Sequence, residues 1–241
     1  MILCIDIGNT NAVLGLYNEK CEKSFRTDRI TEQNFRNFVS GTCIKKIIIS
    51  CVNSEIESEV KEIINLVLKK EPIFIRWDSN LGLKLKLKKP QEIGADLLIG
   101  GFAATIKYGV PNIVVDMGTA TTVFVVNKNK EFLGGAITAG AILSYKELLA
   151  KASKLKNATF LKPTKYIGQD TNEAVGSGVI YGNALMIEGF VNKMKQELGE
   201  DDVKVVITGG MANIIYEFLD NSYIHDDNLL LDGLFEASKI L

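Results

Sequence analysis

The sequence lacks the features that mark several large classes of protein. Its formal net charge is −1, so it carries no excess of positive charge with which to bind a nucleic acid. No apolar run approaches the roughly 18 residues of a membrane-spanning helix. The chain enters an apolar run at residue 2 without a basic segment before it, so no secretory signal peptide is expected. These absences predict a cytoplasmic protein that binds neither nucleic acid nor a membrane.

Cysteine is also scarce, and its spacing argues against a cross-linked or zinc-stabilised fold. The chain has four cysteines with no Cys-x-x-Cys pair, and two of them lie in apolar runs; they are Cys4, Cys21, Cys43 and Cys51. We expect reduced cysteines rather than disulfides or a zinc site. With 46% apolar residues among 241, the chain can build one large domain or two moderate ones.

One pattern occurs twice in the sequence. Residues 2–16 and 112–126 each consist of an apolar run, an Asp-x-Gly step, a small polar cluster and a second apolar run. The two aspartates are Asp6 and Asp116. Each copy is predicted to form a β-hairpin with a carboxylate at the rim of its turn. A repeat of this kind indicates two similar halves.

The turn of each predicted hairpin has the composition of a phosphate-binding loop. Glycine lets a ligand approach the backbone closely, and turn N–H groups with Asn and Thr side chains form an anion-binding concavity. A neighbouring aspartate can hold Mg²⁺. One Asp-x-Gly step alone is more often an ordinary turn, but two copies with matching flanks favour a polyphosphate held by both hairpins.

Two further stretches are candidate site segments, each with a plainer alternative. Residues 94–96, Gly-Ala-Asp, open a predicted helix that runs to about residue 108. Asp96 is either a reactive carboxylate or only a charge that stabilises the helix N-terminus. Residues 208–210, Thr-Gly-Gly, follow a predicted strand. They either lie against a nucleotide or form a plain strand-to-helix turn.

In this order the blocks resemble those of the type III pantothenate kinases, within the actin and sugar-kinase superfamily. Six blocks spread over essentially the whole chain carry the resemblance: residues 6–10, 94–96, 116–122, 134–140, 168–178 and 208–210. It implies an α/β fold of two ribonuclease-H-like (actin-like ATPase) halves, residues 1–109 and 110–241, with a nucleotide cleft between them. The implied reaction transfers the γ-phosphoryl group of ATP to the primary hydroxyl of pantothenate, the first step of coenzyme A synthesis.

The same resemblance implies roles for individual residues. Asp96 would take or orient the proton of the acceptor hydroxyl, which suits a reaction that otherwise needs positioning and charge neutralisation. Asp6 and Asp116 would face Mg²⁺. The residues implied to bind the nucleotide and its phosphates are Asp6, Gly8, Asn9, Thr10, Gly118, Thr119, Thr121, Thr122, Gly209 and Gly210. Those implied to bind the small-molecule acceptor are Gly94, Ala95, Leu97 and Thr171. The helix that starts near Thr171 is rich in small residues and fits the family's homodimer.

Three positions depart from the family pattern. The arginine that usually follows Gly-Ala-Asp is Leu97, and a usual tyrosine falls at Leu87. The resemblance also implies a monovalent cation, K⁺ or NH₄⁺, but Phe124 stands where its acidic ligand is expected. Leucine cannot pair with a carboxylate, which removes about 1.5–3 kcal/mol of charged hydrogen bonding.

Three functions are therefore open. The first, which we favour, is a pantothenate kinase with an altered acceptor pocket. The second is a kinase of the same mechanism that acts on a different small alcohol. The third is a nucleotide-binding regulatory paralogue without catalysis. The presence of Asp96 favours the first two, because a non-catalytic protein does not need it.

Overall fold

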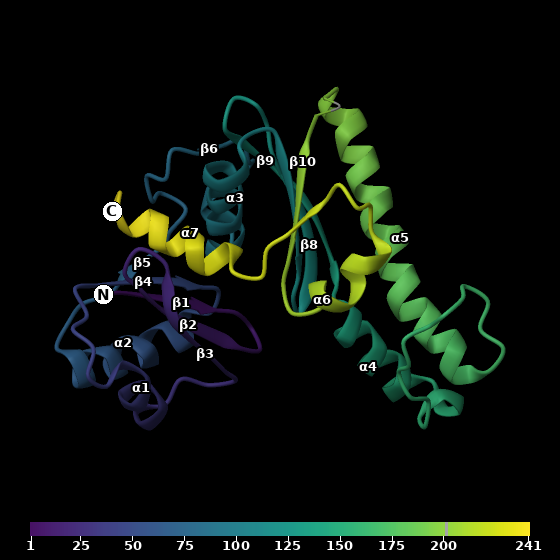
Figure 1. Ribbon diagram of the computed structural model, residues 1–241, viewed down its shortest axis with the longest axis horizontal. Helices are drawn as coiled ribbons and strands as arrows, with labels where there is room; N and C mark the ends of the chain where they lie inside the picture. Colours follow the sequence, from purple (N-terminus) through teal and green to yellow (C-terminus); the bar gives the residue numbers. More distant parts are fainter. Residues whose placement is uncertain (201) are drawn as a thin grey trace. The chain divides into compact units, whose positions relative to one another are not determined.

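Both Asp-x-Gly stretches form the predicted hairpins, and each hairpin lies in a sheet of its own. The computed structural model describes residues 1–200 and 202–241 (Figure 1). By their internal packing these residues divide into two units. The first unit consists of Met1–Lys107 with Asn228–Leu241, and the second of Tyr108–Asp227.

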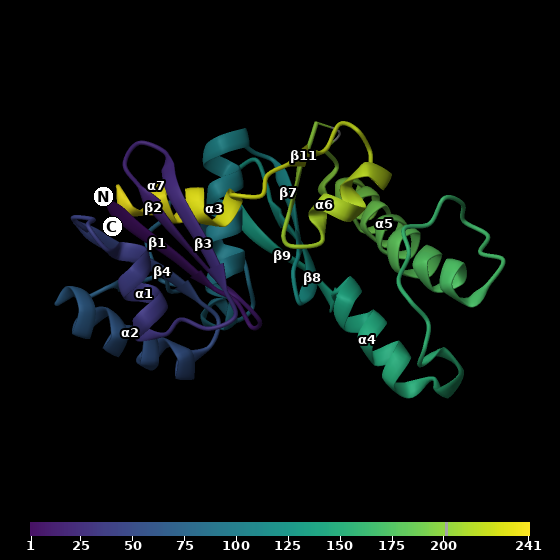
Figure 2. The ribbon, with the colours of Figure 1, turned by 60° about the horizontal axis from the view of Figure 1, so that its bottom comes forward.

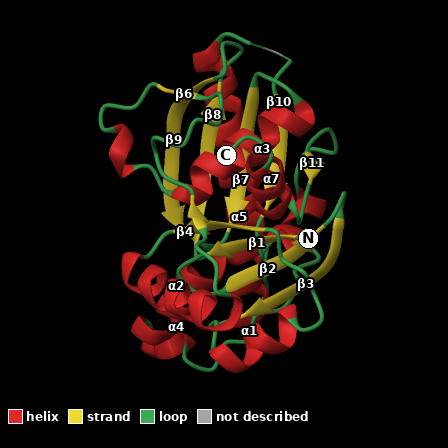
Figure 3. Ribbon diagram, turned by 90° about the vertical axis from the view of Figure 1, so that its left-hand side faces the viewer, coloured by secondary structure: helices red, strands yellow, loops and turns green. Residues whose placement is uncertain are grey.

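The first unit is a mixed sheet with helices on both faces. Its strands run in the order β3-β2-β1-β4-β5 (Figure 3). Strand β2 is antiparallel to both of its neighbours, β1 and β3, whereas β4 is parallel to both of its neighbours, β1 and β5. Helices α1 and α2 cover one face, and α3 and α7 cover the other (Figures 1 and 2). The elements are β1 (Ile2–Ile7), β2 (Ala12–Tyr17), β3 (Cys21–Thr27), α1 (Glu32–Val39), β4 (Lys46–Cys51), α2 (Ser54–Leu68), β5 (Ile73–Phe74), β6 (Lys84–Leu85), a 3₁₀ turn (Pro90–Glu92), α3 (Ala95–Tyr108) and α7 (Leu229–Ser238).

Alternation along β1 explains why both faces are covered. Leu3, Ile5 and Ile7 pack in the core that contains α1 and α2. Cys4, between them, packs in the core that contains α3 and α7. Successive side chains of a strand point to opposite faces, so a run that is apolar throughout requires cover on both sides.

The C-terminal helix α7 belongs to the first unit, whereas the sequence placed residues 110–241 together in the second half. The ring of Tyr17 on β2 stacks on Phe235 of α7 with their centroids 4.9 Å apart. The Tyr17 hydroxyl donates to Oδ1 of Asp232 over 2.7 Å, and Lys107 Nζ lies 2.7 Å from Oδ2 of the same carboxylate. This apolar and charged contact holds the end of the chain on the first sheet.

The second unit repeats the strand order of the first. Its strands run β11-β10-β7-β8-β9, so β7 takes the place of β1, β8 of β2, β9 of β3, β10 of β4 and β11 of β5. The pairings correspond as well, since β8 is antiparallel to β7 and β10 is parallel to it. The elements are β7 (Asn112–Met117), β8 (Ala120–Val126), β9 (Glu131–Ala139), α4 (Ala141–Lys151), a 3₁₀ turn (Ser153–Leu155), α5 (Thr171–Leu198), β10 (Lys204–Thr208), α6 (Ala212–Ile215), a 3₁₀ turn (Tyr216–Phe218) and β11 (Ile224–His225).

Helix α5 is long and apolar enough, by length and composition, to cross a membrane. Half of the apolar stretch is buried within the protein, where Val179, Ile180 and Ile187 join the core of the second unit. A core helix of a folded domain passes the same test of length and composition, so α5 is weak evidence for a membrane span.

Candidate functional site

The turn of the first hairpin is closed and its tip is exposed. The backbone N–H of Gly8 donates to the carbonyl oxygen of Asn11 over 3.0 Å, which closes the turn. Asn9, Thr10 and Asn11 are all exposed. The polar groups of the tip can therefore reach a ligand.

Asp6 lies at the end of β1, on the face that α3 and α7 cover. It is two residues beyond Cys4, so both side chains leave the strand on the same face. In the parallel register Asp6 is opposite Ser50 of β4, and Ile48, two residues before Ser50, packs in the same core as Cys4. Ser50 is fully buried, and its Oγ has no hydrogen-bond partner within the described part of the chain. A buried hydroxyl beside a carboxylate is available to a water or a ligand that reaches these two neighbouring side chains.

The start of α3 lies on the same face of this sheet. Ala95 is buried in the core that contains Cys4 and Ile48. Asp96 follows it, and its Oδ1 accepts a hydrogen bond from the backbone N–H of Leu97 over 2.8 Å. The first sheet therefore carries Asp6, Ser50 and the N-terminus of α3 on one face.

Burial raises the pKa of the Asp96 carboxyl above its ordinary value. Hydrogen bonds from the backbone N–H groups of Leu97 and of Asp96 itself act in the opposite direction. No charged side chain contributes to this shift within the described residues. A raised pKa makes a carboxylate a better proton acceptor once it is ionised.

Gly94 allows the Asp96 side chain to take this position. A Cβ at residue 94 would collide with Oδ1 of Asp96. The next atoms, Cγ of Asp96 and Cγ of Leu97, would lie at 3.5 and 3.9 Å. The absence of a side chain at 94 thus leaves room for the carboxylate to fold back over the helix N-terminus.

The second hairpin is braced by the chain that follows β9. The N–H of Gly140 donates to the carbonyl oxygen of Thr119 over 3.0 Å, and a Cβ at Gly140 would lie only 2.5 Å from that oxygen. The Thr121 and Thr122 hydroxyls are buried without a hydrogen-bond partner in the described residues. The hairpin turn is thus fixed, and the two threonine hydroxyls that follow it lie on opposite faces of the sheet.

The Thr-Gly-Gly stretch lies directly beside Asp116. Thr208 is opposite Asp116 in the parallel register of β10 and β7, and Thr122 is opposite it on the other side. Gly209 has φ +96°, and a Cβ there would collide with Oδ1 of Asp116 and lie 2.5 Å from the nitrogen of Met117. Only glycine fits this turn, and both a nucleotide-side loop and a plain strand-to-helix connection are compatible with that requirement.

Thr171 lies in a different part of the second unit. It is the first residue of α5 and is exposed, and the cap of the helix is Asp170, whose side chain accepts from the N–H of Glu173 over 2.8 Å. Thr171 lines a cavity of about 500 Å³ between α4 and α5. The structure therefore places Thr171 at a cavity between two helices, which the sequence could not indicate.

The candidate residues thus fall into groups within each unit. The first unit brings Asp6, Gly8, Asn9 and Thr10 to its hairpin and holds Gly94, Ala95, Asp96 and Leu97 at the start of α3. The second unit holds Asp116, Gly118, Thr119, Thr121, Thr122 and Gly209 around its hairpin, with Gly210 exposed next to them. Sequence reasoning missed Ser50 and Gly140. A lone serine at the end of the apolar run 46–52 was the available signal for Ser50.

Two of the departures from the family pattern are apolar packing positions. Phe124 is 3% exposed and stacks on Phe132 with their centroids 5.3 Å apart. Leu97 is half-buried next to Asp96. Neither side chain can act as a ligand for an ion.

Comparisons with known proteins identify the family and the fold of the chain. A family model described as type III pantothenate kinase matches residues 2–193. A solved Campylobacter jejuni protein described as a Baf family transcriptional activator is 25% identical, with a TM-score of 0.65, over 99% of this chain and 98% of that one. A 2-dehydro-3-deoxygalactonokinase protein from Sinorhizobium meliloti is 14% identical, with a TM-score of 0.58, over 100% and 99% of the two chains. An N-acetylmannosamine kinase from Listeria monocytogenes is 13% identical, with a TM-score of 0.53, over 99% of each chain. The predicted α/β fold of the actin-like sugar kinases is confirmed.

Proposed function

Because the chain belongs to the type III pantothenate kinase family, we propose that it transfers the γ-phosphoryl group of ATP to the primary hydroxyl of pantothenate through a modified acceptor pocket. Its place among ATP-dependent kinases follows from the family. The observation that supports the proposal most strongly is Asp96. This carboxylate is held at the start of α3, its pKa is raised by burial, and Gly94 leaves room for it.

Asp96 acts on the acceptor hydroxyl in the proposed mechanism. The N–H of Leu97 holds Oδ1, which leaves Oδ2 to accept the hydroxyl proton. As the proton moves to Asp96, the acceptor oxygen attacks the γ-phosphorus, and the bond to the β-phosphate oxygen breaks to give ADP. The carboxylate must be ionised to begin this step, and its raised pKa strengthens it as a base.

The residues of the hairpins fit a magnesium nucleotide. Mg²⁺ is commonly bound by one or two carboxylates together with substrate phosphates rather than by a cage of protein ligands. Each hairpin carries one carboxylate that suits this mode of binding, Asp6 in the first unit and Asp116 in the second. When bound, Mg²⁺ neutralises charge on the phosphates.

The modified pocket supports a second candidate function, phosphorylation of a different small alcohol. Leu97 takes the place of a cation that would pair with the pantothenate carboxylate. No charged side chain of the described residues contributes to the pKa shift of Asp96, so the chain offers no evident substitute next to it. A less acidic acceptor would not need one.

A regulatory role is the third candidate, and the description of the Campylobacter jejuni relative as a transcriptional activator is the observation that brings it forward. The net charge of −1 gives no support for direct binding to DNA. The half-buried carboxylate of Asp96 has no ion pair within the described residues, which is unfavourable for the fold, and catalysis would account for its presence. We therefore place catalysis ahead of regulation.

We also propose that no monovalent cation is bound at residue 124. The ring of Phe124 fills this position and stacks on Phe132. An aromatic pair in the core has no oxygen ligand for K⁺ or NH₄⁺. The enzyme would then work without the cation that the resemblance implies.

A homodimer through α5 is the last part of the proposal. An added methyl group at Gly178 or Gly182 meets no atom within 4 Å, and Leu185 is 59% exposed. These three residues are spaced i, i+4 and i+7 and lie on one face of the helix. Small residues beside an exposed leucine suit close packing of a second helix. Light scattering at micromolar concentration tests the dimer: Gly182→Leu should yield a monomer, and a monomeric unmodified protein would refute it.

The central experiment measures ADP formation by purified protein with Mg²⁺, with and without pantothenate, in potassium and in sodium buffers. We expect pantothenate-dependent ADP formation that Asp96→Asn abolishes. If the protein binds ATP and pantothenate has no effect, a screen of hydroxylated metabolites separates the second function from the third. Turnover of another alcohol would replace pantothenate as the acceptor.

A further inference from the structure

Strand register places an arginine in the same row as Asp6. In the pairing of β1 with β2, Asp6 is opposite Val13. In the pairing of β2 with β3, Val13 is opposite Arg26. Directly opposite residues of antiparallel strands share a face of the sheet. The row therefore runs Arg26, Val13, Asp6 and Ser50 across four strands.

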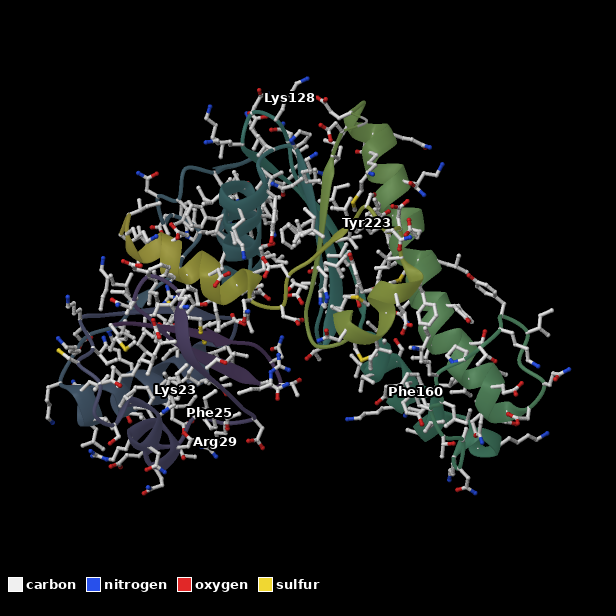
Figure 4. The ribbon with its side chains drawn as sticks, viewed as in Figure 1. Lys23, Phe25, Arg29, Lys128, Phe160 and Tyr223 are labelled. Atoms are coloured by element: carbon white, nitrogen blue, oxygen red, sulfur yellow. The ribbon has the colours of Figure 1, made fainter. Side chains whose placement is uncertain are left out.

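The neighbours of Arg26 on β3 show toward which face of the sheet its side chain points. Phe25 stacks on Phe38 of α1, and Lys23 Nζ lies 4.8 Å from the centre of the same ring. Both side chains lie on the α1 side of the sheet (Figure 4). Arg26 alternates with Phe25, so it points to the opposite face, where Val13 packs in the core with α3 and α7.

Arg26 is the arginine whose charge has no partner. The chain has four arginines. Arg29 pairs with Glu59 and Arg36 with Glu32, at 2.8 and 2.7 Å, and Arg76 pairs with Glu57. Arg26 is exposed, and within the part of the chain that the structure describes it makes no ion pair or hydrogen bond.

The register places Arg26 and Asp6 two strands apart, on either side of Val13. Neighbouring strands lie about 4.8 Å apart, so the two backbones are separated by about 10 Å. Val13, between them, presents only a short apolar side chain. A planar guanidinium with its fork of donors suits a phosphate, and a carboxylate on the other side suits the metal that a polyphosphate carries.

We propose that Arg26 binds the β- and γ-phosphates of ATP across the row from Asp6. This assignment rests on the proposed kinase function and adds to it the residue that supplies positive charge from the first unit. The plainer account is that Arg26 protects an edge, because β3 is the outer strand of its sheet and charged side chains discourage pairing there. An edge-protecting arginine has no effect on nucleotide affinity, so the two accounts make different predictions.

The test is calorimetric titration of the full-length protein with MgATP, MgADP and AMP. The variants are Arg26→Gln, Arg26→Lys, and Lys23→Gln as the matched control. The control removes the same charge from the same strand on its other face. Urea unfolding of Arg26→Gln should match that of the unmodified protein, since Arg26 makes no ion pair or hydrogen bond within the described residues.

We expect Arg26→Gln to weaken MgATP binding by about 10- to 100-fold, the range for a charged hydrogen bond. AMP, which lacks the β- and γ-phosphates, should bind unchanged. The affinity of Arg26→Lys for MgATP should lie between those of Arg26→Gln and the unmodified protein. An ammonium group keeps the positive charge but lacks the paired donors of the guanidinium. Lys23→Gln should bind MgATP as the unmodified protein does.

Three results would overturn the assignment: unchanged MgATP affinity in Arg26→Gln, an equal loss in Lys23→Gln, or an equal loss for AMP. The proposed kinase function is tested by a different measurement, the binding of MgATP to the unmodified protein, which is made before any variant is compared. If the unmodified protein does not bind MgATP, both the kinase function and the role of Arg26 are refuted. If it binds MgATP and Arg26→Gln binds equally well, only the role of Arg26 is refuted.

Discussion

Replacing Gly94 with alanine tests the assignment of Asp96 without altering the carboxylate itself. The added Cβ collides with Oδ1 of Asp96, and its other near neighbours lie at 3.5 Å or beyond. The conflict is thus with the end of one side chain and not with the backbone. Asp96 would rotate away and lose its hydrogen bond from the N–H of Leu97, while the helix stays in place.

The expected result is a fall in kcat with little change in stability or in ATP affinity. A displacement of about 1 Å at a reacting group costs about 100-fold in rate. Steady-state kinetics with ATP and the acceptor measure the fall in kcat. Calorimetry with MgATP measures the nucleotide affinity, which should not change. In the double variant Gly94→Ala/Asp96→Ala, the alanine at 94 should add no further loss, because its target is already gone. An unchanged kcat in Gly94→Ala, or a further loss in the double variant, would refute the role given to Asp96.

The pH dependence of Asp96 follows from the direction of its pKa shift. Burial raises the pKa of this carboxyl in the folded protein, so kcat should fall as the pH drops through a value above that of an ordinary aspartate. A raised folded pKa also means that the group stabilises the fold at low pH and loses this contribution as the pH rises. Asp96→Asn should therefore be inactive and more stable than the unmodified protein at neutral pH. Its advantage in urea unfolding should disappear in acid.

Three other changes have effects that follow from single contacts. Tyr17→Phe removes a hydrogen bond to Asp232 and should lower the free energy of unfolding by about 1–2 kcal/mol, measured in urea. Gly209→Ala forces φ of +96° on a residue with a Cβ only 2.5 Å from the nitrogen of Met117. It should lower stability by at least about 1–2 kcal/mol and weaken MgATP binding in calorimetry. Exchange of potassium for sodium should leave kcat unchanged because Phe124 packs on an aromatic ring; a strong preference for potassium would contradict this.

Local sequence was enough to predict the two hairpins and the helix that begins at Ala95. An apolar run followed by Asp-x-Gly specifies strand and turn without reference to distant residues, and both hairpins form as expected. The repetition of that pattern predicted two similar halves, and the fold class followed from the resemblance to the type III pantothenate kinases. The turn at Gly209 was predicted only as one of two alternatives, because its contact with Asp116 is made between different strands.

The parts that could not be predicted depend on contacts between distant segments. The return of α7 to the first unit rests on Tyr17 stacking against Phe235, residues more than two hundred positions apart. Ser50 and Arg26 join Asp6 only through the register of β4 and β3. A shift of one residue in either pairing would turn these side chains to the other face, and nothing in the local sequence fixes that register.

The equivalent rows of the two sheets have some side chains of the same kind and some that differ. In the first unit Asp6 is flanked by Ser50 and by Val13, with Arg26 beyond. In the second unit the corresponding row has Thr208, Asp116 and Thr122, with Ile137 beyond. The hydroxyl on the parallel side is kept in both, as Ser50 and Thr208.

The outer position of the row is where the units differ. The first unit presents the exposed cation Arg26 there, and the second presents Ile137, which is 69% exposed. A guanidinium suits a polyphosphate, whereas an exposed isoleucine suits an apolar portion of a ligand. The Asp-x-Gly hairpin therefore sets where a carboxylate and a turn stand in each unit. The third strand of each sheet shares no motif with its counterpart, so the two rows end in side chains of different chemistry.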